Sequence, residues 1–399
     1  MLKDLQAGFT YYYVTSLVVL LGALFGFSFV APCKEAPTSG TGDFVDALFA
    51  WDGRWYRGIA TEGYSFDAHE RSNVAFYPAY PGVSAALSWI SGLQLRYSLL
   101  LVSHGSLAAA FVLLVRYARL RFPEMSDEAR DYIPVCFGLL PTTYFFRMGY
   151  SESLFVLLLL MAMWGIERRW RTVWIVFVVG AATACRAVGV ALLAPLAMHL
   201  WETSRTRTAF TLRSAVWLPL ACWGLAAWVA YQAVEFGEPW AFIQTQQHWS
   251  TRQTSLFSWD GIAALLSFRP IRSVYDPASP CYWGNFPPRD NPAFNLMFAN
   301  PIYFLGTAAL VVAGRAKGWL SNRETALSAA LLLIPYVLQA DRACMAAEAR
   351  YASSVFPAYF VMGHLLARLP GALAGVLLGL SATFLAIYSA LFVRWYWFY

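Results

Sequence analysis

Long apolar runs separated by short charged segments cover almost the whole chain. The runs fall at residues 11–31, 97–115, 132–146, 152–166, 173–185, 187–200, 215–234, 294–314, 325–340, 351–367 and 371–393. A helix that crosses a bilayer needs about 20 apolar residues, and fewer where bundle neighbours cover its ends. The pattern predicts an all-α polytopic membrane protein with about eleven transmembrane helices. The first run is longer than the apolar core of a signal peptide and no A-x-A site follows it, so we interpret it as a retained helix.

Two long polar stretches interrupt this pattern, at residues 33–96 and 235–293. In the first, Gly, Pro, charged and aromatic residues are interleaved, which favours short amphipathic helices lying in the membrane interface. The second contains Pro, Gly and Trp with little periodicity. The short apolar runs on either side of Arg186 fit either two spans or one broken pair. Because apolar runs extend from end to end, we expect a single integral membrane domain over residues 1–399.

The composition supports a membrane protein and argues against a nucleic-acid-binding protein. Hydrophobic residues make up 59% of the chain and charged residues only 13%, about half the charged share of soluble domains. The aromatic content of 17% fits belts of aromatic side chains at two membrane interfaces. A net charge of +6 can indicate nucleic-acid binding, but no cluster of Lys and Arg lies on a soluble-looking segment. We therefore expect no nucleic-acid partner.

The distribution of Lys and Arg orients the predicted helices. With a cytoplasmic N-terminus, the inner segments are 1–10, 116–131, 167–172, 201–214, 315–324 and 368–370. These short segments carry about half of the 29 Lys and Arg residues, whereas most Asp and Glu fall on the other side. Positive charge in short loops marks the cytoplasmic side of a membrane. Both long loops are therefore expected on the outer face, where functional residues should gather.

The six cysteines show no CxxC or Cys/His spacing of a metal site, and we expect no metal. Three of them lie inside apolar runs, where Cys is usually a small core residue. Cys33, Cys281 and Cys344 fall in the expected outer loops, where a disulfide can form. The sequence leaves open which of them pair.

The first outer loop contains the densest mixture of polar and aromatic residues, around Asp52. It reads Trp51-Asp52-Gly53-Arg54-Trp55-Tyr56. Aromatic neighbours at an interface partly desolvate a carboxylate and strengthen it as a base, which deprotonation of a sugar hydroxyl requires. An Asp that caps an interfacial helix would give the same pattern, and both interpretations remain open.

Glu152 and Arg186 are charged residues at expected membrane depth. Glu152 opens a long apolar helix, where the helix N-terminus favours its charge; ionisable groups at such depth also mark functional sites with a charged partner. Arg147 and Arg186 are the candidate partners. Arg186 interrupts an apolar tract, and its planar fork suits either the carboxylate of Glu152 or the phosphate of a substrate.

Two later segments add candidate residues on the outer face. One is a charged turn with Asp341, Arg342, Glu348, Arg350 and Tyr351, although a short loop facing water would look the same. The other is the segment of Gln244, Gln246, Gln247, His248 and Trp249, which offers hydrogen-bond donors and a stacking ring of the kind that sugars bind. A lone His such as His248 is also common in ordinary loops.

These residues resemble the motifs of the PIG-V-type mannosyltransferases, which have the GT-C fold and act in glycolipid-anchor assembly. The first motif is matched by Trp51-Asp52, Ile59-Ala60, Gly63-Tyr64 and Ala75-Phe76-Tyr77-Pro78; the later ones are matched by Tyr150-Ser151-Glu152-Ser153-Leu154-Phe155, Arg186 with Gly189, and Arg350-Tyr351 with Pro357. The order of the motifs agrees over residues 51–357. The family commonly has a second Phe where this chain has Tyr77, and the loop 235–293 has no evident counterpart, which leaves the acceptor open.

The resemblance implies a GT-C-like helical bundle with interfacial helices in the first outer loop and a catalytic face formed by loops 33–96 and 235–293. It implies an inverting glycosyltransferase that moves a hexose, by analogy mannose, from a polyprenyl-phosphate donor to a lipid or glycan acceptor, without a metal cofactor. Asp52 would be the general base, and Arg186 and Arg350 would stabilise the leaving phosphate. The substrate-binding candidates are Trp51, Arg54, Tyr56, Arg147, Tyr150, Glu152, Arg186, Gln247, His248, Arg350 and Tyr351.

Two other functions fit a polytopic chain: a transporter or flippase of a lipid-linked or small polar solute, and a subunit that scaffolds an enzyme. Transporters favour internal repeats and polar groups near the bilayer midplane, whereas here the polar groups collect at outer span ends and we see no repeat. A scaffold does not explain Asp52 and Glu152 in their motifs. We therefore expect a glycosyltransferase, with a bacterial inner membrane as its location and its site on the periplasmic or lumenal side.

Overall fold

A computed structural model describes residues 2–34, 42–251 and 258–396, and within these ranges the chain is helical and contains no strand. The helices are α1 (Leu2–Phe29), α2 (Phe44–Ala47), α3 (Asp52–Glu62), η2 (Asn73–Ala75), α4 (Ala79–Ser91), α5 (Leu95–Arg121), α6 (Asp127–Leu139), η3 (Pro141–Arg147), α7 (Glu152–Glu167), α8 (Thr172–Cys185), η4 (Ala187–Leu192), α9 (Leu193–Glu202), α10 (Arg207–Leu220), α11 (Trp223–Phe236), α12 (Ala241–Gln244), η5 (Thr245–Trp249), α13 (Trp259–Leu266), α14 (Arg269–Tyr275), η6 (Trp283–Asn285), η7 (Pro292–Phe294), α15 (Leu296–Ala316), α16 (Asn322–Pro335), η8 (Tyr336–Ala340), α17 (Glu348–Ser353), α18 (Pro357–Leu366) and α19 (Gly371–Phe392). The prediction of an all-α protein is confirmed.

Four of the described helices, α1, α5, α15 and α19, are long and apolar enough to cross a membrane. Two bent pairs bring this to six if each pair is one span: η3 with α7, bent by 98°, and α10 with α11, bent by 46°. The other apolar helices are shorter, and the predicted number of about eleven spans stays a prediction. Five of the apolar runs are divided between two helices: 132–146 between α6 and η3, 187–200 between η4 and α9, 215–234 between α10 and α11, 325–340 between α16 and η8, and 351–367 between α17 and α18. The first break lies at Leu140, because a residue before proline disfavours helical backbone.

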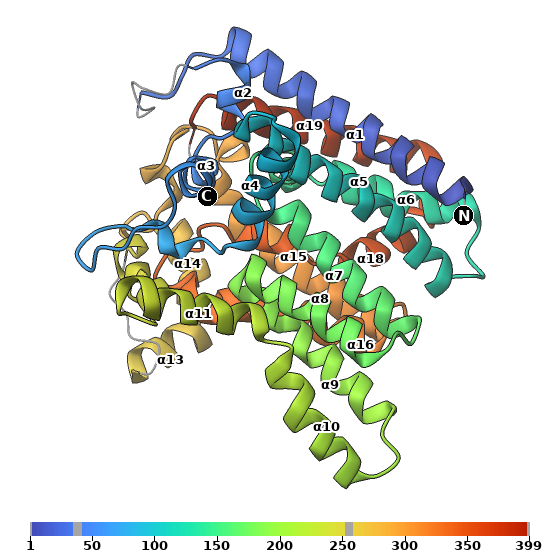
Figure 1. The fold of residues 1–399 in the computed structure, drawn as a ribbon. Coiled ribbons are helices and arrows are strands. Elements are labelled where there is room, and N and C mark those ends of the chain that lie inside the picture. Colours follow the sequence, from blue (N-terminus) through green and yellow to red (C-terminus); the bar gives the residue numbers. More distant parts are fainter. Residues whose placement is uncertain (1, 35–41, 252–257, 397–399) are drawn as a thin grey trace.

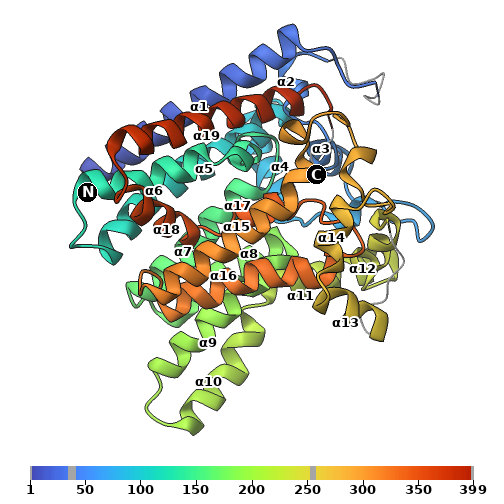
Figure 2. The same cartoon turned by 180° about the vertical axis from the view of Figure 1, so that it is seen from behind.

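The short helices of both long loops gather at one end of the bundle. Figure 1 shows α2, α3, α4, α13 and α14 on the side that also holds the C-terminal end of the described chain, with the start of α1 at the far side. The reverse view in Figure 2 shows the same grouping. The predicted short helices of the first outer loop are present as α2, α3 and α4. We refer to this region as the outer-loop end.

Ion pairs join the segments at the opposite end of the bundle. Arg121 donates two hydrogen bonds to the buried Glu324, at 2.8 and 3.0 Å. Arg323 pairs with Glu167 at 3.1 Å and also with Glu202, and Arg119 pairs with Asp4. The segments that the charge pattern assigned to one side of the membrane therefore do meet.

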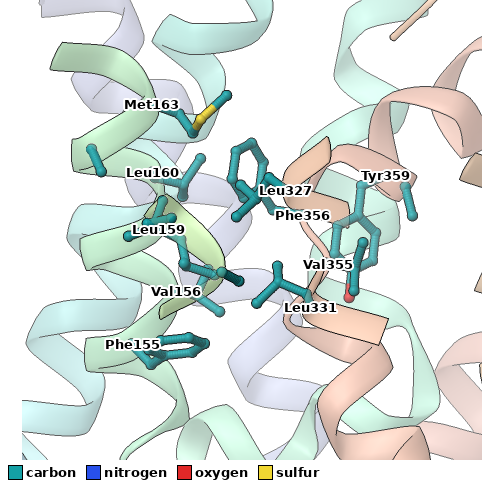
Figure 3. Close-up of a cluster of buried hydrophobic side chains, with 14 of the residues drawn as sticks. Phe155, Val156, Leu159, Leu160, Met163, Leu327, Leu331, Val355, Phe356 and Tyr359 are labelled. Carbon is teal, nitrogen blue, oxygen red and sulfur yellow. The ribbon is translucent and has the colours of Figure 1, made fainter. Parts of the chain in front are cut away.

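The main hydrophobic core packs α7 against α16, α18 and the turn that joins α17 to α18. Phe155, Val156, Leu159, Leu160 and Met163 of α7 face side chains of these segments (Figure 3), and all five are fully buried. The facing residues are Leu327, Leu331, Val355, Phe356 and Tyr359. The core therefore holds α7, which carries Glu152, beside the turn that directly follows α17, which carries Arg350.

Helices α1 and α19 pack closely along one edge of the bundle (Figures 1 and 2). A Cβ atom added at Gly22 would lie 2.4 Å from the carbonyl oxygen of Ala386, and one at Gly26 would lie 2.3 Å from that of Ala390. Small residues four apart let helix backbones approach in this way within membranes. The α1–α19 contact therefore depends on the two glycines.

We predict that Gly22→Ala destabilises the protein by about 1–3 kcal/mol, because the added methyl group overpacks the contact with α19. The measurement is the thermal unfolding midpoint in detergent. Gly375→Ala on α19 is the matched control, since nothing lies within 4 Å of its Cβ position. Equal midpoints for the two variants would contradict this account of the helix pair.

Candidate active site

Asp52 and Glu152 are buried carboxylates that each occupy the first residue of a helix. Asp52 begins α3 and Glu152 begins α7; their exposed fractions are 5% and 1%. The helix N-terminus favours negative charge at both positions. The N-cap residue of α3 is Trp51, which makes no side-chain cap bond. The alternative that Asp52 is an N-cap residue is therefore wrong.

Arg350 joins these two carboxylates. Its Nη1 donates to Asp52 Oδ2 at 2.6 Å, and its Nε lies 3.3 Å from Glu152 Oε1. Arg186 donates through Nη1 to the same oxygen of Glu152. The result is a connected set of four buried charges, Asp52–Arg350–Glu152–Arg186, which we call the charge network. Its two anions and two cations balance, and this balance makes their burial tolerable.

Tyrosine side chains surround the two guanidinium groups. The guanidinium of Arg350 lies 5.6 Å from the ring centre of Tyr150 and 5.8 Å from that of Tyr351, and the guanidinium of Arg186 lies 5.3 Å from the ring of Tyr351. The Tyr56 hydroxyl is 2.8 Å from Ser151 Oγ, to which Arg186 also donates, at 3.3 Å. The faces of these rings attract the two guanidinium groups. The N–H groups of the guanidinium groups still point at their hydrogen-bond acceptors.

A break in the apolar tract places Arg186 at this site. Helix α8 ends at Cys185, and Arg186 itself has extended backbone angles before η4 begins. The structure thus has two short helices meeting at Arg186. Of the two arginines considered as partners of Glu152, the structure pairs Arg186.

A braced turn positions Arg350. Three residues of the turn before α17 have left-handed φ angles: Cys344 (58°), Met345 (59°) and Ala347 (66°). A disulfide joins Cys344 to Cys281, which settles the pairing that the sequence left open. Asp341 accepts hydrogen bonds from Arg269 at 3.0 and 2.7 Å. The expectation that this turn can be an ordinary loop facing water is wrong, because Asp341, Glu348 and Arg350 are all buried.

Other predicted residues lie outside the charge network. Arg147 is buried and donates to Ser16 Oγ at 3.0 Å and to Thr15 Oγ1 at 2.7 Å, so it ties η3 to α1. His248 contacts the carbonyl oxygen of Ala68 at 2.9 Å through Nε2, and this contact places η5 over the first outer loop. Gln247 is its exposed neighbour, and Arg54 lies on an exposed face of α3. Substrate binding by these four side chains stays a prediction.

Glu348, which the sequence showed only as one charge of the turn before Arg350, is 1% exposed, and neither carboxylate oxygen has a hydrogen-bond partner among the described residues. Sequence analysis did not single out Trp395. This residue returns from the far end of the chain to contact Trp51, with 5.3 Å between ring centres. Nothing in the local sequence signals this contact, because it joins distant parts of the chain. Among the described residues, no group of three or more His, Cys, Asp or Glu is placed to hold a metal ion.

The buried Glu348 predicts a pH-dependent stability. Glu348 lies in α17, outside the helices long enough to cross the membrane, and burial raises the pKa of its carboxyl well above the usual value. Above about pH 4.3 the unfolded chain ionises this group while the folded chain keeps its proton, so stability falls by up to about 1.4 kcal/mol per pH unit until the folded-state pKa is reached. Because Gln does not ionise, Glu348→Gln should not show this fall in stability with rising pH.

We therefore expect Glu348→Gln to unfold at a higher temperature than the wild type at pH 7 to 8, with the difference vanishing near pH 4. Thermal unfolding in detergent across this pH range measures it. Glu124→Gln, at an exposed loop position, should follow the wild-type profile. Parallel profiles for wild type and Glu348→Gln would show that the carboxyl is ionised in the folded protein.

The family model described as Mannosyltransferase (PIG-V) matches residues 23–321. The human and rat proteins named GPI alpha-1,6-mannosyltransferase 2 are each 31% identical over 153 residues, which cover 35% of this chain. The matched part spans 29% of the human protein and 30% of the rat protein, less than a third of either.

Two solved structures have a similar arrangement of helices. One is ArnT from Cupriavidus metallidurans bound to undecaprenyl phosphate, with a TM-score of 0.48, 13% identity, and coverage of 96% of this chain and 75% of that chain. The other is the apo oligosaccharyltransferase of Archaeoglobus fulgidus, with a TM-score of 0.44, 14% identity, and coverage of 96% and 56%. At these values the likeness concerns the arrangement of helices alone.

Proposed function

This chain belongs to the PIG-V mannosyltransferase family, and on that premise we propose that it transfers a hexose, by its family mannose, from a polyprenyl-phosphate-linked donor to a hydroxyl of a lipid or glycan acceptor. The observation that supports this proposal is the charge network at the outer-loop end. It combines a carboxylate suited to accept a proton with two guanidinium groups suited to bind phosphate. A glycosyl transfer from a lipid phosphate needs both.

In the proposed reaction Asp52 accepts the proton of the acceptor hydroxyl. The oxygen of that hydroxyl attacks the anomeric carbon of the sugar, and the bond from this carbon to the phosphate oxygen breaks with inversion. The polyprenyl phosphate leaves with the bonding electrons and gains negative charge. Arg350 and Arg186 stabilise this charge, because their planar forks match phosphate oxygens. These two cations would supply the charge that a metal ion supplies in other phosphate sites.

Arg350 links the phosphate site to Asp52 through a direct contact, because its Nη1 donates to Asp52 Oδ2 at 2.6 Å. The donor phosphate would compete with this carboxylate for the same guanidinium, so its binding would loosen the Asp52–Arg350 pair. The carboxylate oxygen would then be available to the acceptor hydroxyl only when the donor is bound.

Glu152 would orient both the arginines and the sugar. One of its oxygens pairs with Arg186 and Arg350, whereas Oε2 is buried with no hydrogen-bond partner among the described residues. An unpaired buried carboxylate oxygen is costly, and a sugar hydroxyl is a suitable donor to it. Tyr56, Tyr150 and Tyr351 would hold this geometry through the contacts described above.

The site would face the periplasm of a bacterial inner membrane, or an organelle lumen. Basic short loops at the opposite end support a cytoplasmic N-terminus. The Cys281–Cys344 disulfide lies at the outer-loop end, and disulfides persist in oxidising compartments. Both observations favour the same orientation.

We predict that Asp52→Asn lowers transfer by about 10²–10⁴-fold, the usual contribution of a general base. Asn keeps the size of the side chain and can still accept the hydrogen bond from Arg350. The measurement is transfer of radiolabelled mannose from polyprenyl-phosphate-mannose to a lipid extract by purified protein. The anomeric configuration of the product tests inversion.

Asp43→Asn is the matched control, since Asp43 is an exposed carboxylate of the same loop paired with Arg96 at 2.7 Å. It should retain full activity. Wild-type activity in Asp52→Asn would refute the base assignment and leave the enzyme class standing. A wild type inactive with a panel of polyprenyl-phosphate sugars would refute the donor class.

A further inference from the structure

Helices α9 and α10 form a hairpin that projects from the bundle on the side away from α1 and α19 (Figures 1 and 2). Helix α10 packs against α9 and α8, yet none of its residues is buried. The turn of the hairpin lies at the end of the bundle opposite the outer-loop end, where Glu202 pairs with Arg323. The reaction proposed above makes no use of this hairpin.

Exposed arginines gather on the hairpin and on the neighbouring start of α8, and within the described part of the chain none of them forms an ion pair. The only carboxylates of the same two segments, Glu167 and Glu202, are both taken by Arg323. The protein itself therefore leaves this positive charge without a counter-ion. The exposed arginines are Arg168, Arg169, Arg171, Arg205 and Arg207.

Arginines on the other side of this end of the bundle have acidic partners. Arg121 pairs with the buried Glu324 at 2.8 Å, and Arg119 pairs with Asp4. The rule that places cations on one side of a membrane accounts for both groups of arginines. It does not account for the absence of acids beside the hairpin, and a surface with one sign of charge attracts a ligand of the opposite sign.

Arg213 gives this positive surface a defined geometry. Its Nη1 donates to Thr203 Oγ1 and to Ser204 Oγ, both at 3.1 Å, and these bonds hold the guanidinium against the turn of the hairpin. Its Nε and Nη2 groups donate to no residue that the structure describes and remain available to a ligand. Guanidinium N–H groups beside hydroxyls are a common set of phosphate ligands.

The buried His199 shows that cations from three segments converge here. Arg323, Arg213 and Arg169 all lie within electrostatic reach of its imidazole. Arg169 comes from the start of α8, and Arg213 comes from α10. The positive surface is therefore shared between helices and is not a property of the turn alone.

An exposed apolar face continues from this surface along α10. Leu212, Val216 and Leu220 are four residues apart, so they lie on one face of the helix, and all three are exposed. The exposed Trp201 meets the edge of Phe210 with 5.0 Å between ring centres, and Trp is typical of the membrane–water interface. The hairpin thus offers a site for an anion directly beside a site for an alkyl chain.

We propose that the hairpin binds an anionic glycerophospholipid of the surrounding membrane, with its phosphate held by Arg205, Arg207 and Arg213 and an acyl chain along the exposed face of α10. Basic pockets between membrane helices bind anionic headgroups in this way. A soluble phosphate would leave the apolar face uncovered, and a zwitterionic lipid would bring a cation beside the arginines. This lipid is distinct from the donor, whose proposed site lies at the outer-loop end.

Three variants separate a defined lipid site from general attraction to a basic surface. Arg205→Gln/Arg207→Gln removes two exposed charges without breaking an ion pair. Arg315→Gln/Lys317→Gln is the matched control, because it removes two exposed cations where α15 ends. Arg213→Lys keeps the charge but removes the planar fork.

Native mass spectrometry of the purified protein in a neutral detergent measures the apparent Kd for phosphatidylglycerol and for phosphatidylcholine with the same acyl chains. Wild type and Arg315→Gln/Lys317→Gln should both prefer phosphatidylglycerol. Arg205→Gln/Arg207→Gln should bind phosphatidylglycerol at least about tenfold more weakly, from the usual contribution of two arginines near an anionic headgroup. Arg213→Lys should also weaken this binding, and an excess of inorganic phosphate should leave the lipid bound.

Equal affinity of the wild type for the two lipids would overturn the proposal. So would an equal loss of affinity in the hairpin variant and its control, or wild-type affinity in Arg213→Lys, since either result would leave only a diffuse attraction to the basic end. Displacement of the lipid by inorganic phosphate would overturn it as well and would indicate a site for a soluble anion. Thermal unfolding without added lipid checks that the variants are folded.

Discussion

The burial of the four side chains of the charge network is the constraint on which the rest of the structure depends. Asp52, Arg350, Glu152 and Arg186 come from α3, α17, α7 and the junction after α8. At membrane depth an unpaired charge is expensive, whereas a pair that is fully matched is tolerated. The four segments must therefore lie in one relative arrangement, since displacing any of them would leave a charge without its partner. The hydrophobic core between α7 and α16–α18 sets the same arrangement by packing.

Breaks in the helices follow from this requirement. A charged side chain in the middle of a continuous apolar helix would face lipid or an apolar neighbour. The structure instead places Asp52 and Glu152 at helix starts, Arg186 at the end of α8 and Arg350 in a helix of six residues. Helix ends expose backbone N–H and C=O groups and carry partial charge, so they are the least costly places for ions in an apolar bundle. The turn before Arg350, with three residues in the left-handed region, is tied to the second long loop by the Cys281–Cys344 disulfide.

Sequence analysis identified the members of the charge network but not their pairing. Asp52, Glu152, Arg186 and Arg350 each stand out because a charge interrupts an apolar or aromatic stretch, and such an interruption is visible locally. Which of them meet is not visible, because the Asp52–Arg350 bond joins residues 298 positions apart. Local spacing made Arg147 as good a partner for Glu152 as Arg186, and only the fold shows Arg147 among the hydroxyls of α1. Helix positions were predictable where apolar runs are long, as in α1, α5, α15 and α19. The bend between α10 and α11 was not predicted, because that run is continuous in composition.

Helix α3 carries Asp52 on its buried face toward Arg350. The residue before it, Trp51, has a φ of 58° and is the N-cap of the helix, so this strained residue lies where α3 leaves the preceding turn. The Asp52 amide donates to the Tyr150 hydroxyl, which in turn donates to the carbonyl oxygen of Ala50, so the same turn is tied to the loop that precedes Glu152. The position of the Asp52 carboxylate therefore depends on two restraints from different parts of the chain: the ion pair with Arg350 and the hydrogen bonds through Tyr150 that hold the start of α3.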